Sequence, residues 1–221
     1  MFLREKSILD FSEGNLVARL LSPDWHYRIV NIAGMPLNPV HFEEVSLSGV
    51  PHKEDRGDVD ILLYNPARPQ HSVAIEVKRV KFGSEAIATL RPNKVHELAK
   101  GVEQANRLAR IGFSQVYFYA FVMVDSRAQN AGQNTYAGTS MEAKELIRRF
   151  TDEAFHKLDK RVGMYCCEFT QSQDFAPLGA GGFHGNLRRA AQAIEQRAEL
   201  TEWVARISEP EQKPLASPVR N

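Results

Sequence analysis

Two neighbouring stretches decide the fold of this chain: Asp58-Val59-Asp60-Ile61-Leu62-Leu63-Tyr64 and, after a turn, Ser72-Val73-Ala74-Ile75-Glu76-Val77-Lys78-Arg79-Val80. Both are rich in apolar and β-branched residues, which predicts strands over 58–64 and 72–80. Side chains alternate along a strand, so Asp58 and Asp60 lie on the same face of the first strand. For the same reason Glu76 and Lys78 lie on the same face of the second strand. If the two strands are neighbours, an aspartate, a glutamate and a lysine converge at the sheet surface.

The segments on either side supply the remaining elements. Phe42 to Leu47 predicts a further strand, and the short connections between the three strands favour an antiparallel meander. Residues 25–39 stay open between a strand around 27–32 and irregular coil. The other predicted elements are a helix over 13–21, capped by Ser12 and closed by Ser22-Pro23, a helix from Pro92 to about Ile111, a strand over 115–124, a loop over 125–139, a helix from Ser140 to about Leu158, a strand over 162–169, a flexible turn over 179–185 and a final helix over 186–207.

This order predicts an α/β fold with three layers, in which helices cover both faces of a mixed sheet of about five strands. The chain has 221 residues, with 43% hydrophobic and 25% charged, which suits one generous domain over 1–208. Residues 209–221 hold three prolines and no periodic pattern, and we expect a disordered tail there.

Composition narrows the choice of partners and compartment. The net charge is +1, from 28 basic and 27 acidic residues, whereas a protein that grips a long duplex usually shows a larger basic excess. No apolar run approaches the roughly 20 residues of a membrane helix, and the N-terminal residues lack the apolar stretch of a secretion signal. Cys166 and Cys167 are adjacent and point to opposite faces of a strand, which makes a disulfide between them unfavourable. We therefore expect a cytoplasmic protein with no membrane partner.

Charged side chains inside apolar strands are costly unless they are paired or bind a metal. Two carboxylates offer the oxygen ligands that Mg²⁺ prefers, and such an ion polarises a phosphate and activates water. A lysine beside them could orient or help deprotonate that water, or neutralise charge on the phosphate. The alternative is a solvated sheet face whose charges only form ion pairs. The sequence thus favours a phosphodiester-cleaving site.

The segment resembles the PD-(D/E)xK nuclease superfamily, the restriction-endonuclease-like fold, over about residues 10–125. Asp60 and the run Glu76-Val77-Lys78 match its pattern, as does the order of helices and strands around them. The resemblance implies that Asp60 and Glu76 bind the metal, that the Val77 carbonyl completes the shell and that Lys78 assists the nucleophile. Gly57-Asp58 departs from the usual Pro-Asp, which leaves Asp58 as an alternative to Asp60; we favour Asp60 because the uninterrupted apolar run starts right after it.

Members of this superfamily often add a glutamate on the first helix and a glutamine on the helix after the Glu-x-Lys motif. Glu13 and Gln104 stand at the corresponding places. The resemblance implies a Mg²⁺- or Mn²⁺-dependent nuclease that acts on nucleic acid, DNA rather than RNA, and that works as a homodimer or within a larger complex. A catalytically inactive nuclease-fold subunit, serving as a nucleic-acid-binding or assembly module, is the alternative.

Overall fold

The computed structural model describes residues 7–35, 40–50, 57–83, 89, 95–128, 140–171 and 181–208. Six strands form one mixed sheet in the order β1-β2-β3-β4-β5-β6. The strands are β1 (Val40–Ser46), β2 (Asp58–Asn65), β3 (Arg68–Phe82), β4 (Gln115–Asp125), β5 (Gly163–Gln171) and β6 (Gly181–Arg189). The helices are α1 (Glu13–Leu20), α2 (Pro23–Ile32), α4 (Val95–Ile111), α5 (Met141–Lys157) and α6 (Ala198–Ser208), with short 3₁₀ turns η1 (Ile8–Asp10) and η2 (Leu47–Gly49).

The sheet changes from antiparallel to parallel at β3. Strands β1, β2 and β3 form the predicted antiparallel meander. Strand β4 pairs parallel to β3, and β5 pairs parallel to β4, because α4 and α5 carry the chain back across the sheet between them. Strand β6 returns antiparallel to β5. The long β3 therefore has β2 on one side over its first half and β4 on the other side.

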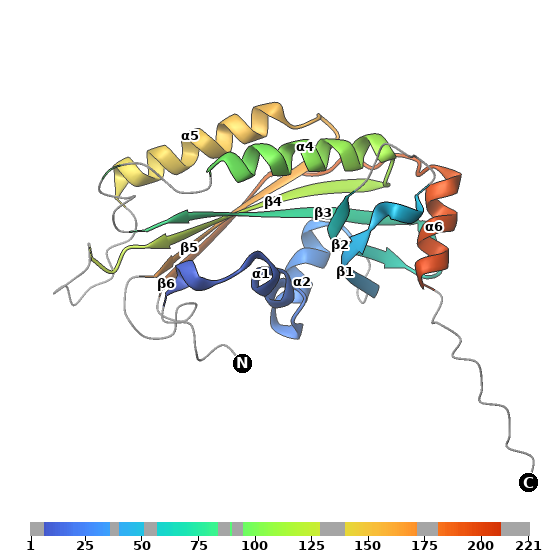
Figure 1. Ribbon diagram of the computed structural model, residues 1–221, viewed down its shortest axis with the longest axis horizontal. Coiled ribbons are helices and arrows are strands. Elements are labelled where there is room, and N and C mark those ends of the chain that lie inside the picture. Colours follow the sequence, from blue (N-terminus) through green and yellow to red (C-terminus); the bar gives the residue numbers. More distant parts are fainter. Residues whose placement is uncertain are drawn as a thin grey trace, which may run out of the picture.

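Helices cover both faces of the sheet, as Figure 1 shows, with α4 and α5 above it and α1 and α2 below it. The alternating side chains of the strands build a separate core on each face. On the upper face Ala74, Phe118 and Val122 pack with α4, α5 and α6. On the lower face Ile75 and Val77 pack with η1, α1 and α2. Both faces being buried explains the nearly continuous apolar sequence of β4.

Local sequence signals account for several helix boundaries. Ser12 Oγ accepts a hydrogen bond from the Asn15 N–H at 3.0 Å and caps α1, and Ser140 Oγ accepts from the Ala143 N–H at 3.2 Å and caps α5. On α4 the residues Leu98, Val102, Ala105 and Leu108 are buried at spacings of three and four, whereas the predicted start of the helix at Pro92 lies outside the described residues.

Four expectations are corrected. The sheet has six strands rather than about five, because residues 181–185, predicted to be a turn, begin β6 and pair with β5. The final helix spans 198–208 and not 186–207, since 186–189 complete β6. Residues 23–32 form α2, neither strand nor coil. Ser22-Pro23 consequently separates two helices, with Pro23 in the first turn of α2, where its missing N–H costs nothing.

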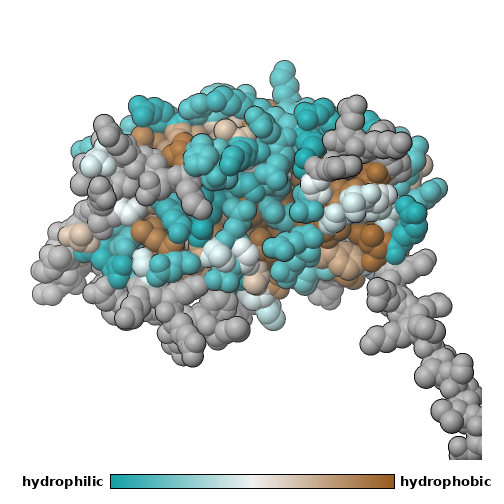
Figure 2. Space-filling view, viewed as in Figure 1, coloured by the Kyte–Doolittle hydropathy of each residue, from teal (hydrophilic) through white to brown (hydrophobic). Residues whose placement is uncertain are grey.

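The surface on this side of the molecule (Figure 2) is mostly hydrophilic. Figure 2 shows mainly hydrophilic residues on this side of the molecule, with hydrophobic residues in separate patches. Among the described residues, no helix has the length and apolar character needed to cross a membrane. The predicted disordered tail, 209–221, lies outside the described residues.

Candidate functional site

Strands β2 and β3 separate at Asp60. Their pairing includes Leu63 with Val73 and Ile61 with Ile75, and no pair is formed at Asp60. Instead, Asp60 Oδ2 accepts a hydrogen bond from the Val77 N–H at 2.6 Å. The aspartate carboxylate thus takes the place that the carbonyl of a strand partner would occupy. Within the described residues, the pairing of β2 with β3 therefore ends at Ile61 and Ile75.

Glu76 and Lys78 lie on the same face of β3, as the alternation predicted. Glu76 is fully buried, and Lys78 is 7% exposed. Lys78 Nζ lies 2.5 Å from Glu76 Oε1 and 3.7 Å from Asp60 Oδ2, and it donates a hydrogen bond to the Val77 carbonyl at 2.9 Å. The carboxylates of Asp60 and Glu76 and the carbonyl of Val77 therefore surround the ammonium group of Lys78, as predicted from the sequence.

Helix α1 contributes Glu13 to this group. Glu13 Oε1 lies 3.2 Å from Lys78 Nζ, and its side chain is 39% exposed. Asp58, by contrast, is exposed and pairs with Ser46 at the start of β2. Gln104 is half-buried on α4 and makes no hydrogen bond or ion pair with the site in the described part of the chain. Of the secondary candidates, the structure brings in Glu13 and leaves Asp58 and Gln104 out.

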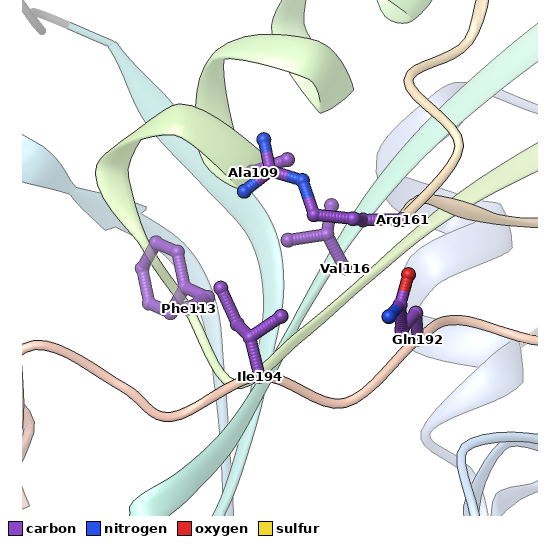
Figure 3. A pocket seen from close by; sticks show the side chains of 6 residues that line it. All are labelled: Ala109, Phe113, Val116, Arg161, Gln192 and Ile194. Carbon is purple, nitrogen blue, oxygen red and sulfur yellow. The ribbon is translucent and has the colours of Figure 1, made fainter.

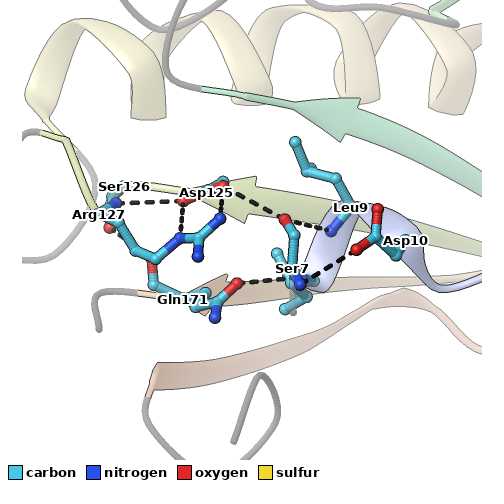
Figure 4. A network of polar contacts seen from close by, with 8 residues as sticks. Ser7, Leu9, Asp10, Asp125, Ser126, Arg127 and Gln171 are labelled. Atoms are coloured by element: carbon cyan, nitrogen blue, oxygen red, sulfur yellow. Dashed lines mark hydrogen bonds and ion pairs between the residues drawn. The ribbon is translucent and has the colours of Figure 1, made fainter. Parts of the chain in front are cut away.

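The position of α1 depends on how η1 is held against the sheet. In the polar network of Figure 4, Ser7 Oγ donates to Asp125 Oδ2 at 3.3 Å, and the Ile8 N–H donates to Gln171 Oε1 at 2.8 Å. Arg127 forms an ion pair with Asp125 at 2.7 Å. These contacts attach η1 to the ends of β4 and β5. Because α1 starts three residues after η1, the same contacts help to place Glu13.

Sequence reasoning missed Glu44. This residue lies on β1 opposite Asp60, between the pairs Glu43–Ile61 and Val45–Val59. It has a φ of 50°, a left-handed conformation that is unusual for a non-glycine residue. Its charge acts on Asp60, where it raises the pKa of that carboxyl. The acidic pair Glu43-Glu44 was visible in the sequence, but nothing in the alternation showed that Glu44 acts electrostatically on Asp60.

Burial dominates the electrostatics of the site. It raises the pKa of Glu76 from 4.5 to about 8, and the nearby Asp60 carboxylate adds to the effect, while Lys78 opposes it. Burial also raises the pKa of Asp60, although Lys78 and the Val77 N–H lower it in part. For Lys78, burial lowers the pKa, but the carboxylates of Glu76 and Asp60 outweigh this and hold it above its usual value. The site favours added positive charge.

The residues present fit a hard divalent cation. Both Glu76 carboxylate oxygens are buried; the Lys78 ammonium lies 2.5 Å from Oε1, and Oε2 accepts no hydrogen bond from the described residues. Among the described residues, four carboxylates interact here, against two cationic side chains, Lys78 and Arg79. The donor set of Asp60, Glu76 and the Val77 carbonyl consists of oxygen atoms, which Mg²⁺ prefers. In the described ranges, no three His, Cys, Asp or Glu side chains are arranged so that they could hold one ion together. The proposed donor set therefore combines two carboxylates with a backbone carbonyl.

Gly101 allows α4 to approach the Lys78 side chain closely. A Cβ atom at this position would lie 2.4 Å from Lys78 Cγ and 2.6 Å from Phe118 Cε2. Helix propensity alone would make Gly101→Ala stabilising by about 1 kcal/mol. We expect the opposite, a loss of about 1–3 kcal/mol in the free energy of unfolding, because α4 or the lysine stem must shift. Urea unfolding of the variant measures this loss.

The matched control is Gly14→Ala on α1. There the added Cβ would meet only Ser12 Oγ, at 3.9 Å. This variant should be neutral or slightly stabilised. Equal effects of the two substitutions would contradict the close approach of α4 to Lys78.

A second hollow lies away from these carboxylates. Figure 3 shows it near the end of α4, lined by Ala109, Phe113, Val116, Arg161, Gln192 and Ile194. The Arg161 guanidinium is paired with Asp159 at 3.0 Å. The hollow is mainly apolar and offers no group of reactive side chains, so the cluster on β3 is the better candidate site.

Comparison with known proteins identifies no relative: no protein-family model matches the chain, and no curated protein matches it.

Proposed function

We propose that this protein is a metal-dependent nuclease of the PD-(D/E)xK type, which hydrolyses phosphodiester bonds in nucleic acid, with DNA favoured over RNA. The observation that carries the proposal is the convergence of Asp60, Glu76, Lys78 and the Val77 carbonyl at the point where β2 and β3 separate. The α/β sheet with helices on both faces is compatible with the restriction-endonuclease-like class.

Each residue has a role that follows from its position. Asp60, Glu76 and the Val77 carbonyl would hold Mg²⁺ or Mn²⁺, which supplies Lewis-acid polarisation of a phosphate and an acidified water when bound. Lys78 presents an ammonium with three donors next to all of these oxygens. It would orient the attacking water or donate to a phosphate oxygen on which charge develops. Glu13 holds Lys78 from the α1 side.

A cleavage panel tests the proposal. The full-length protein is incubated with linear, circular, single-stranded and branched DNA and with RNA of the same sequences, in Mg²⁺, Mn²⁺ or EDTA. We expect cleavage of at least one substrate in Mg²⁺ or Mn²⁺ and none in EDTA. Titration calorimetry with Mn²⁺ should show binding by the wild-type protein and much weaker binding by Asp60→Asn.

The panel also separates the alternative function. Nucleic-acid binding with no cleavage of any substrate would replace the enzyme by a non-catalytic binding or assembly subunit. Cleavage that continues in EDTA would contradict a metal-dependent site. Metal binding that is equally strong in Asp60→Asn would place the ion elsewhere in the chain.

A further inference from the structure

Arg79 is a charged group that the proposed mechanism leaves unused. It follows Lys78 on β3, so its side chain leaves the opposite face of the strand, the face on which α1 packs. The residue is half-buried, and its Nη1 atom is inaccessible to solvent and makes no hydrogen bond. The described residues form no ion pair with it. A guanidinium in such a position needs an explanation.

Burial of this guanidinium carries an energetic cost, which the Glu13 carboxylate offsets only in part. Burial lowers the pKa of Arg79, whereas the carboxylate of Glu13 raises it. An arginine stays charged in proteins in spite of such a shift. Glu13, the carboxylate that acts on it, is already engaged with Lys78 Nζ at 3.2 Å. Both cations thus interact electrostatically with one carboxylate, and Arg79 Nη1 has no hydrogen-bond acceptor among the described residues.

The site also repels the substrate that the proposed function requires. Glu13, Glu44 and Asp60 create a concentration of negative charge, to which Glu76 adds once it loses its proton. A divalent ion neutralises part of it, but a nucleic-acid strand brings one negative phosphate per nucleotide on either side of the reacting bond. A cation next to the metal ligands is needed to hold these flanking phosphates. Arginine suits this role because its planar fork matches two phosphate oxygens.

We propose that Arg79 binds a backbone phosphate of the nucleic-acid substrate next to the scissile one, on the α1 side of the site. This inference rests on the proposed function, since it presumes a nucleic-acid strand lying across the point where β2 and β3 separate. It assigns Arg79 to substrate binding and leaves the metal and the attacking water to Asp60, Glu76 and Lys78.

Binding measurements with three variants test the role of Arg79. Fluorescence anisotropy follows a labelled DNA oligonucleotide in Ca²⁺, which binds oxygen ligands like Mg²⁺ does, with gel analysis to show that the DNA stays intact. We expect Arg79→Ala to weaken binding by about tenfold or more. The slope of log K against log salt should fall by about 0.7 for single strands or about 0.9 for duplexes, which corresponds to one lost phosphate contact.

Two further variants separate a phosphate contact from a structural role. Arg79→Lys keeps the charge and should keep the salt slope while it loses affinity, because lysine cannot bind two phosphate oxygens with a planar fork. Arg110→Ala, at an exposed position on α4, should change neither quantity. Circular dichroism checks that each variant is folded. An unchanged salt slope in Arg79→Ala, or an equal change in Arg110→Ala, overturns the inference.

The outcomes distinguish this inference from the proposed function. If the wild-type protein binds DNA with the expected Arg79 dependence but does not cleave it, the inference stands and the enzymatic proposal fails. If the wild-type protein cleaves DNA and Arg79→Ala binds as well as wild type, the enzymatic proposal stands and the inference fails. A wild-type protein that binds no nucleic acid overturns both.

Discussion

Replacing Glu76 by Gln is expected to lower metal-dependent cleavage by roughly 10³-fold or more, because the substitution removes a buried charge that would hold the ion and leaves the shape of the side chain unchanged. Lys78→Met should cause a loss of similar size through the missing ammonium. Initial rates on the best substrate of the cleavage panel, at saturating Mg²⁺, measure both effects. Glu43→Gln, an exposed neighbour on β1, is the matched control and should cleave like wild type.

The two variants should differ in stability, which separates structure from chemistry. Above about pH 8, where the Glu76 carboxyl of the wild-type protein is ionised, Lys78→Met removes its partner 2.5 Å away and leaves the buried carboxylate unpaired or forces it to take up a proton. Breaking such a pair typically costs about 3–5 kcal/mol. The double variant Glu76→Gln/Lys78→Met removes both charges and should recover most of this stability but none of the cleavage. A double variant that regains activity would refute the roles assigned to these residues, and one as unstable as Lys78→Met would refute the tight coupling of the pair.

The stability of the metal-free protein should fall as the pH rises from about 5 to about 8.5, and Glu76→Gln should weaken this fall. The pKa of Glu76 is raised from 4.5 to about 8 in the folded state. The folded protein consequently holds a proton that the unfolded chain has lost, and the stabilisation from this group is lost as the pH rises through that interval. The shift sets an upper limit of about 4 to 5 kcal/mol on the effect.

Other titratable groups also contribute to the pH dependence of stability. The pKa of Asp60 is also raised, so it adds to the same trend starting at lower pH. Lys78 has a raised pKa as a base, and its contribution is present throughout this interval and is lost only at higher pH. Outside the site, burial and the neighbouring His41 lower the pKa of His26 below its usual value of 6.5, so that this group contributes the opposite slope. Comparing variants at each pH cancels the contributions of groups that do not interact with Glu76, such as His26.

Urea unfolding in EDTA across the pH series measures the prediction, with wild type, Glu76→Gln and Glu43→Gln side by side. Glu43→Gln should follow the wild-type curve. Glu76→Gln should make the protein more stable than wild type at the alkaline end, since it removes the cost of a buried charge. Parallel curves for wild type and Glu76→Gln over the whole interval would show that Glu76 does not carry this proton.

The alternation in β3 was sufficient to predict that Glu76 and Lys78 share a face, because the period of two is a local property of the strand. The caps Ser12 and Ser140 likewise marked α1 and α5, since a capping hydrogen bond spans three residues. By contrast, the glycine-rich start of β6 has a weak strand signal of its own, and its conformation comes from pairing with β5. The segment 23–32 carried no decisive local pattern, and it forms a helix that packs on the lower face through Ile29.

The site shows the same division. Sequence alone determined which charged residues lie in apolar strands and which of them share a face, since both follow from residue type and local periodicity. Only the tertiary structure decided that β2 and β3 separate at Asp60 so that its carboxylate receives the Val77 N–H. It also decided that Glu13, 65 positions from Lys78, joins the group, and that Asp58 and Gln104 do not. Which groups meet depends on strand separation and helix packing, and these are set by contacts between distant parts of the chain, which no local pattern encodes.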